Sequence, residues 1–206
     1  MKKDSGEYQF YKPYEIQPAD FQVTEKPGKI IIRCEPKEVN GYSYQLTKEI
    51  QILESGFRIL YHLKNTGEKT ISTDEYNHNF MAINNEMVGV NYRLKFPFTM
   101  KPELIEGNVN PEGKVNVGTN NFTFNGTPEK QFFFGNLSGG QTVDATWELI
   151  NTSTGIGIRE TGSFKTNKIN LWGWKQVISP ELFFSIRVEP GKEIEWSRTY
   201  SIFETK

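Results

Sequence analysis

The sequence predicts an all-β fold, and three observations lead to that prediction. Aromatic residues make up 14% of the 206-residue chain, and aromatic residues favour strands over helices. Polar and apolar residues alternate with period two in many short segments, whereas no segment keeps apolar residues at helical spacing. Gly, Asn and Pro separate these segments, as in tight turns. We therefore expect one large sandwich of antiparallel sheets, with residues 1–206 forming a single domain.

The first predicted strands follow from this alternation. Residues 29–35, KIIIRCE, form a strand in which Cys34, the only cysteine, is expected to be small and buried. Residues 42–52, YSYQLTKEIQI, alternate strictly and place Lys48 on the face with the apolar side chains. A hairpin loop then leads into residues 57–65, FRILYHLKN.

The remaining predicted strands carry the same period. They are residues 87–96, 145–151, 155–160, 169–174, 181–189 and 193–203. The stretch from Met100 to Gly140 is rich in Gly, Asn and Pro, which predicts long loops with a short strand or two around NFTFNG and KQFFFG. Long loops in a compact sandwich tend to border a site.

Composition excludes several function classes. The formal net charge is -1, from 24 Lys and Arg against 25 Asp and Glu, so we expect no nucleic-acid partner. No apolar run approaches the length of about 18 residues that a membrane span needs, and no apolar segment follows the N-terminal lysines. These observations predict a soluble, cytoplasmic protein without a membrane partner. The sequence does not indicate an oligomeric state.

The motifs that are missing narrow the chemistry further. The sequence holds no phosphate-binding Gly-rich loop, no cysteine cluster and no serine in a nucleophile elbow. With His62 and His78 as the only histidines, we expect no metal and no cofactor. Acid/base chemistry by one histidine and one carboxylate stays open, because it needs neither.

His78 and Glu181 are the candidates for that pair. His78 lies between Asn77 and Asn79 in TDEYNHNFMAI, at the start of a strand-like run. Glu181 opens a predicted strand after Pro180, on the face opposite Leu182, Phe184, Ile186 and Val188. The alternatives are a structural histidine and a solvated glutamate. His62 lies on a polar strand face, and we assign it a structural role.

Further polar-site candidates come from residues that are out of place. Lys48 and Arg198 each fall in phase with apolar neighbours, where a long cationic side chain reaches the edge of the sheet or lines a polar pocket. Trp172, Trp174 and Trp196 fit either a core or a flat platform for a sugar ring. Both uses stay open at this point.

Two segments in the same order resemble the aldose 1-epimerase, or galactose mutarotase-like, superfamily. One is YHLKNTGEKTISTDEYNHNFMAI, residues 61–83, with a histidine among Asn and aromatic neighbours. The other is SPELFFSIRVEPGKEIEWSRTYSIF, residues 179–203, with a glutamate before a PG turn and a final strand. The resemblance covers most of the chain from about Tyr8 onward.

The resemblance implies a β-supersandwich that interconverts sugar anomers by opening a cyclic hemiacetal. It implies His78 as general acid on the ring oxygen and Glu181 as general base on the anomeric hydroxyl, across a sugar-sized gap. Asn77 and Asn79 would orient the imidazole or contact the sugar, and we add Lys48, Trp174 and Arg198 as candidate sugar contacts. The expected partner is an aldose.

Family members also carry an N-terminal arginine and a further histidine that this chain does not match. We therefore expect N-terminal strands of the family to be missing, as in a C-terminal fragment, a truncated gene product or a reduced relative. The alternatives to catalysis are a carbohydrate-binding β-sandwich and recognition of a phosphorylated hexose, which requires convergent cationic side chains.

Overall fold

The computed structural model describes residues 11–13 and 18–205, and within them the prediction of an all-β fold is confirmed. Its regular structure is antiparallel strand apart from one short 3-10 helix, η1, at Pro102–Leu104. No helix in the described part of the chain is long and apolar enough to cross a membrane.

Two compact units make up the described chain. The first contains the residues up to Ile52, together with Arg58–Thr73 and Ile186–Ser197. The second contains Leu53–Phe57, Asp74–Ser185 and the residues from Arg198 onward. The single domain expected from the sequence stays a prediction.

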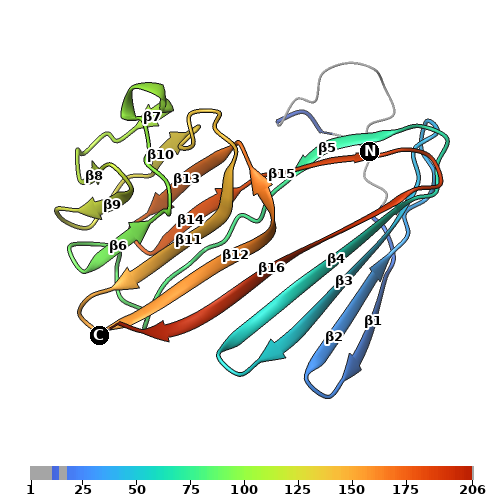
Figure 1. Ribbon diagram of the computed structural model, residues 1–206, viewed down its shortest axis with the longest axis horizontal. Coiled ribbons are helices and arrows are strands. Elements are labelled where there is room, and N and C mark those ends of the chain that lie inside the picture. Colours follow the sequence, from blue (N-terminus) through green and yellow to red (C-terminus); the bar gives the residue numbers. More distant parts are fainter. Residues whose placement is uncertain (1–10, 14–17, 206) are drawn as a thin grey trace. The chain divides into compact units, whose positions relative to one another are not determined.

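The first unit contains antiparallel strands, of which β1 to β4 pair in sequence order and β16 pairs with β4. Its strand order is β1-β2-β3-β4-β16 (Figure 1), with bounds β1 Phe21–Lys26, β2 Lys29–Cys34, β3 Tyr44–Leu53, β4 Gly56–Asn65 and the first part of β16 Glu193–Glu204. Tyr61 of β4 stacks on Trp196 of β16 with ring centroids 4.9 Å apart. Cys34 is buried, as expected.

The second unit contains a larger and a smaller sheet. The larger has the order β16-β12-β11-β6-β9-β8, formed by the later part of β16, β12 Ile156–Thr166, β11 Val143–Asn151, β6 Tyr92–Lys95, β9 Asn121–Phe124 and β8 Val115–Val117. The smaller has the order β14-β13-β10-β7 (Figure 1), formed by β14 Val177–Leu182, β13 Ile169–Trp174, β10 Phe132–Gly135 and β7 Glu106–Val109. A two-stranded sheet pairs β15 Phe184–Val188 with β5 Ile71–Glu75.

Aromatic side chains join the two sheets of the second unit. Phe122 of β9 contacts Phe134 of β10, and Phe124 contacts Phe132, with ring centroids 5.2 and 5.8 Å apart. Phe122, Phe132 and Phe134 are almost completely buried. One face of each sheet is thus devoted to the core, which leaves the other face of the smaller sheet for a site.

The stretch from Met100 to Gly140 contains more regular structure than predicted. The expected strands around NFTFNG and KQFFFG are confirmed as β9 and β10, and η1, β7 and β8 accompany them. The two extra strands are only four and three residues long. Unlike β9 and β10, neither of them contains an aromatic residue, so neither stands out from the Gly, Asn and Pro around it.

The predicted strand over residues 181–189 is wrong, because it is two strands in different sheets. β14 ends at Leu182 and β15 begins at Phe184, and between them the Phe183 backbone N–H donates to the Lys168 carbonyl oxygen. Glu181 is consequently the penultimate residue of β14 and not the first residue of a strand. The alternation of apolar residues continues through Phe183, which hides the change of sheet.

Candidate functional site

The segment from Tyr76 to Met81 carries His78, and it runs beside β14 without forming a full strand. Met81 and Ile178 exchange both of their backbone hydrogen bonds, at 2.9 and 3.0 Å. The Ile178 N–H points toward this segment, and two residues further on Pro180 occupies the equivalent position without an N–H to donate. The predicted strand start at His78 is therefore wrong: the residue lies in an extended segment after β5.

Asn77 and Asn79 point in one direction from this segment, toward β16 and β12. Their amide nitrogens donate to the Tyr200 hydroxyl at 3.1 and 3.0 Å, and Asn79 also donates to Glu160 Oε2 at 3.0 Å. Because side chains alternate along an extended backbone, His78 projects to the opposite side. The two carboxamides therefore anchor the segment that presents the imidazole.

The antiparallel register places His78 directly across from Glu181. Met81 pairs with Ile178 in an antiparallel bridge. His78 precedes Met81 by three residues and Glu181 follows Ile178 by three, so the two residues lie opposite each other with their side chains on one face. His78 Nε2 lies 3.3 Å from Glu181 Oε1. The imidazole side chain is 38% exposed, whereas the carboxylate side chain is only 6% exposed.

This contact corrects the expectation of a sugar-sized gap between the two groups. Their functional atoms touch, so no ring fits between them. The ring oxygen and the anomeric hydroxyl of a hemiacetal are, however, bonded to the same carbon. A donor and an acceptor that lie side by side can therefore address both oxygens from one direction.

Burial of the carboxylate sets its proton affinity. Desolvation raises the pKa of Glu181, and the neighbouring His78, the Asn170 amide and the Lys168 ammonium oppose this effect in that order. Asn170 Nδ2 is 3.5 Å from Glu181 Oε2. A carboxylate with a raised pKa is a stronger base than an ordinary glutamate.

Aromatic rings surround the imidazole on the accessible side. Phe80 and Trp172 lie 4.8 and 5.1 Å from the His78 ring, measured between centroids. Phe80 is 64% exposed, and Trp172 is half-buried. Tyr76 stacks on Phe183 at 4.5 Å, one step along the same face. The pair thus lies within a partly exposed aromatic surface.

Arg198 is part of a buried charge cluster under this segment. Its guanidinium is fully buried and donates to Glu160 Oε1 at 2.7 Å, Glu75 Oε2 at 2.8 Å and the Leu182 carbonyl at 2.9 Å. Trp147 Nε1 donates to the other Glu160 oxygen at 2.9 Å. Burial raises the pKa of Glu160 while Arg198 opposes the shift. These contacts are typical of a structural ion pair. The role of Arg198 in sugar binding stays a prediction.

Lys48 and Trp174 each have a recorded contact with a group other than the acid/base pair. Lys48 belongs to the first unit, where its ammonium lies 5.2 Å from the Tyr61 ring centroid. Trp174 donates from Nε1 to the Glu129 carbonyl oxygen at 2.9 Å. Their roles in sugar binding stay predictions. The tryptophan that reaches the imidazole is Trp172, two residues earlier on the same face of β13.

Asn170 and Trp172 are site residues that sequence reasoning left unassigned. In INLWGW they alternate with Ile169 and Leu171, which are fully buried in the core. The alternation alone puts them on the outer face of β13. What the sequence lacked was the partner strand: Asn170 pairs with Glu181, and Trp172 pairs with Ser179.

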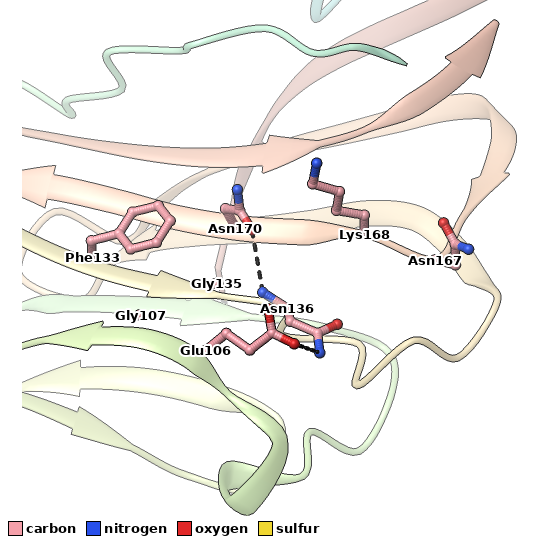
Figure 2. Close-up of a pocket in the computed structure, with 8 residues that line it drawn as sticks. All are labelled: Glu106, Gly107, Phe133, Gly135, Asn136, Asn167, Lys168 and Asn170. Carbon is pink, nitrogen blue, oxygen red and sulfur yellow. Dashed lines mark hydrogen bonds between the residues drawn. The ribbon is translucent and has the colours of Figure 1, made fainter. Parts of the chain in front are cut away.

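A pocket of about 530 Å³ adjoins the pair on this sheet face. Figure 2 shows Asn170 beside the Asn136 backbone and Glu106 beside the Asn136 side chain, with Phe133 at one end. Within residues 11–13 and 18–205, no group of three His, Cys, Asp or Glu side chains is arranged to hold a metal ion.

No protein-family model matches the chain, and no curated protein matches its sequence. Solved structures do match its fold. A candidate aldose 1-epimerase from Escherichia coli K12 superposes with a TM-score of 0.66 at 9% identity, over 90% of this chain and 69% of that one. A galactose mutarotase-like protein from Lactobacillus casei gives 0.62 at 11% identity, over 89% and 73% of the two chains.

A galactose mutarotase related enzyme from Lactobacillus acidophilus gives a TM-score of 0.61 at 9% identity, over 91% of this chain and 72% of that one. This chain therefore spans roughly two thirds to three quarters of the length of these three structures. Identities this low carry the comparison no further than architecture. The chain has the galactose mutarotase-like β-sandwich fold.

Proposed function

We propose that this chain interconverts the anomers of a reducing sugar, with His78 as general acid and Glu181 as general base. The observation that carries the proposal is the 3.3 Å contact between a partly exposed imidazole and a buried carboxylate. Such a pair supplies one proton donor and one proton acceptor without a metal. The similarity to mutarotase-like folds supports the same reaction class.

The reaction needs two proton transfers. The imidazolium of His78 gives a proton to the ring oxygen, Glu181 takes the proton of the anomeric hydroxyl, and the bond between the anomeric carbon and the ring oxygen breaks. The open aldehyde rotates about its bond to the next carbon and closes on its other face. Both protons then return, so the protein ends as it began.

The surroundings of the pair suit a neutral sugar. Trp172 and Phe80 offer flat apolar surfaces beside the imidazole, and pockets for small molecules combine such surfaces with few polar groups. Asn77 and Asn79 act through the backbone in this proposal, because their amides bind Tyr200 and hold His78 in place.

His78→Ala and Glu181→Gln test the proposal directly. Each variant should slow anomerisation by roughly 10²-fold or more, because each removes one proton-transfer group. The rate is measured by polarimetry and by NMR exchange between anomers on a panel of aldoses. The pH of the buffer must be held fixed, because water and buffer catalyse the same reaction.

His62→Ala is a matched control, because this chain contains a second His–Glu pair with the same spacing. His62 Nε2 lies 3.3 Å from Glu193 Oε2, in the first unit. Its removal should leave the rate within about twofold, as expected of a surface substitution. Equal losses from His62→Ala and His78→Ala would overturn the assignment.

A carbohydrate-binding β-sandwich without catalysis is the second candidate. It is favoured by the direct His78–Glu181 contact, which leaves no gap between the two groups, and by the exposure of Phe80. Sugar binding by the unmodified chain with an anomerisation rate equal to that of buffer alone would establish this candidate.

A further inference from the structure

The pocket beside the pair has no part in the two proton transfers, since neither His78 nor Glu181 lines it. Its lining comes from β7, β10, β13 and the turns next to them, namely Glu106, Gly107, Phe133, Gly135, Asn136, Asn167, Lys168 and Asn170. Its volume of about 530 Å³ falls within the range of roughly 300–1,000 Å³ typical of small-molecule sites.

The polar lining fits a neutral ligand with many hydroxyl groups. Asn136, Asn167 and Asn170 bring amides, each of which both donates and accepts hydrogen bonds. Glu106 and Lys168 have opposite charges, so the pocket carries no net charge. A phosphate would need convergent cations and would meet the Glu106 carboxylate instead.

Phe133 supplies an apolar surface at the end of the pocket in Figure 2. Gly107 and Gly135 lie against its ring: a Cβ at either position would come within 3.2 and 3.3 Å of a ring carbon, respectively. Glycine at both positions therefore leaves room for the Phe133 ring against the backbone. A flat apolar ring among amides is suited to packing against the face of a sugar.

Asn170 connects the pocket to the acid/base pair. Its Oδ1 accepts from the Asn136 backbone N–H at 3.2 Å (Figure 2), and its Nδ2 is 3.5 Å from Glu181 Oε2. A second connection runs through the sheet, because Phe133 pairs with Trp172, whose ring lies 5.1 Å from the His78 ring. A ligand larger than one sugar ring could contact both places on one sheet face.

We infer that the pocket binds the second sugar unit of a reducing oligosaccharide whose reducing end lies at His78 and Glu181. Only the reducing-end ring carries a hemiacetal, so that ring must lie at the acid/base pair and the glycosidically linked unit occupies the pocket. This inference rests on the proposed function and names its substrate class.

The test compares reducing disaccharides with monosaccharides. Cellobiose, maltose and lactose are titrated calorimetrically against glucose and galactose, and trehalose, which has no hemiacetal, serves as a ligand that cannot be anomerised. At least one reducing disaccharide should bind about tenfold more tightly than its monosaccharide, a difference of about 1.4 kcal/mol. Anomerisation of that disaccharide should show the same preference in kcat/KM.

Asn167→Trp fills the pocket and Asn167→Ala removes one amide, and both substitutions are in an exposed turn. Asn167→Trp should abolish the disaccharide preference and leave glucose affinity and glucose anomerisation within about twofold, whereas Asn167→Ala should reduce the preference partially. Asn116→Trp, at an exposed asparagine of β8 outside the pocket, is the control and should change neither.

The outcomes separate this inference from the proposed function. Glucose anomerisation that depends on His78, combined with equal affinities for mono- and disaccharides, overturns the inference alone. A disaccharide preference that survives Asn167→Trp also overturns it. Binding of a disaccharide through the pocket, with no anomerisation above the buffer rate, overturns the proposed catalysis and leaves the pocket assignment in place.

Discussion

Glu181 combines burial with a direct histidine contact, and this combination defines the chemistry at the residue scale. The carboxylate is 5% exposed as a residue and contacts the partly exposed His78. Burial alone would drive it toward the protonated form, and His78, Asn170 and Lys168 favour the ionised form. The net result is a raised pKa, which is the direction a general base needs for work near neutrality.

The pH dependence of anomerisation should report this raised pKa. Because the base is active when ionised, the rate should fall as pH decreases through the pKa of Glu181, above the value of about 4.3 of an ordinary glutamate. Asn170→Ala removes an amide that favours the ionised form. The acid limb of kcat/KM should therefore move to higher pH in that variant.

Lys165→Ala is the control for this measurement, because Lys165 pairs with Asp144 on the surface and is not among the groups that shift the pKa of Glu181. Its pH profile should coincide with that of the unmodified chain. An acid limb that stays in place in Asn170→Ala would show that Glu181 does not set it.

Sequence reasoning found the two candidate reacting residues but not their neighbours. His78 and Glu181 came from a resemblance in motif order, which needs no knowledge of strand pairing. Trp172 could not be preferred to Trp174 in the sequence, because both lie on one face of β13 and only the pairing with β14 separates them. Arg198 looked available because its partners, Glu75 and Glu160, are far away in the chain.

At the element scale, the segment 76–81 is held on both sides by different means. Asn77 and Asn79 bind Tyr200 on one side, and Met81 joins β14 through one pair of backbone hydrogen bonds. Pro180 prevents a longer ladder. The position of His78 therefore depends on side-chain amides more than on sheet hydrogen bonds.

Asn79→Ala should show this dependence. It deprives the buried Glu160 carboxylate and the Tyr200 hydroxyl of a donor, which should cost about 1–3 kcal/mol in the free energy of unfolding. The anomerisation rate should fall as well, because the segment that carries His78 loses an anchor. Urea denaturation and polarimetry measure the two effects.

Asn125→Ala provides the comparison, because the exposed Asn125 amide donates a long bond to the Gly113 carbonyl oxygen, at 3.4 Å. Its free energy of unfolding should stay within about 0.5 kcal/mol of the unmodified chain. If Asn79→Ala were equally mild, the amide anchors would have no measurable importance.

Most strands were predictable from their alternation, whereas breaks between strands were not. The hairpin of β3 and β4 is confirmed because its turn and both of its strands are contiguous in the sequence. The break at Phe183 was missed because apolar alternation runs through it. The break exists because β14 pairs with β13, whereas β15 pairs with β5 in another sheet. Which strand each of them pairs with depends on distant parts of the sequence.

At the scale of the whole molecule, the architecture was predictable as a class but its pairing was not. Period-two alternation and frequent turns led to antiparallel sheets, and this is confirmed. The order β14-β13-β10-β7 places β13 next to β10, although β11 and β12 lie between these two strands in the sequence. The local sequence of these strands does not specify their order, because any strand with one apolar face can cover the same core.

Self-association should be a property of the whole molecule, because charge repulsion is weak and one edge strand exposes two large apolar side chains. The formal net charge is -1 and the isoelectric point is about 6.2. At the edge of the described sheet, β1 exposes Phe21 by 66% and Val23 by 59%. Val23→Lys should reduce association near pH 6, measured by light scattering over a concentration series.

Thr24→Lys adds the same charge to β1 without removing an apolar side chain, so it separates the two effects. A smaller reduction in scattering from Thr24→Lys would assign the association to the apolar edge. Identical scattering from Val23→Lys and the unmodified chain would contradict the prediction.

The alternation around His78 also limits how the length of the chain can change. Between the end of β5 and Met81, the loss or gain of a single residue would exchange the two sides of the segment, turning the imidazole toward the buried Arg198 and Glu160 and the carboxamides toward solvent. A change of two residues would preserve the sides. In this part of the chain, the parity of an insertion or deletion therefore matters more than the identity of the residues that it adds or removes.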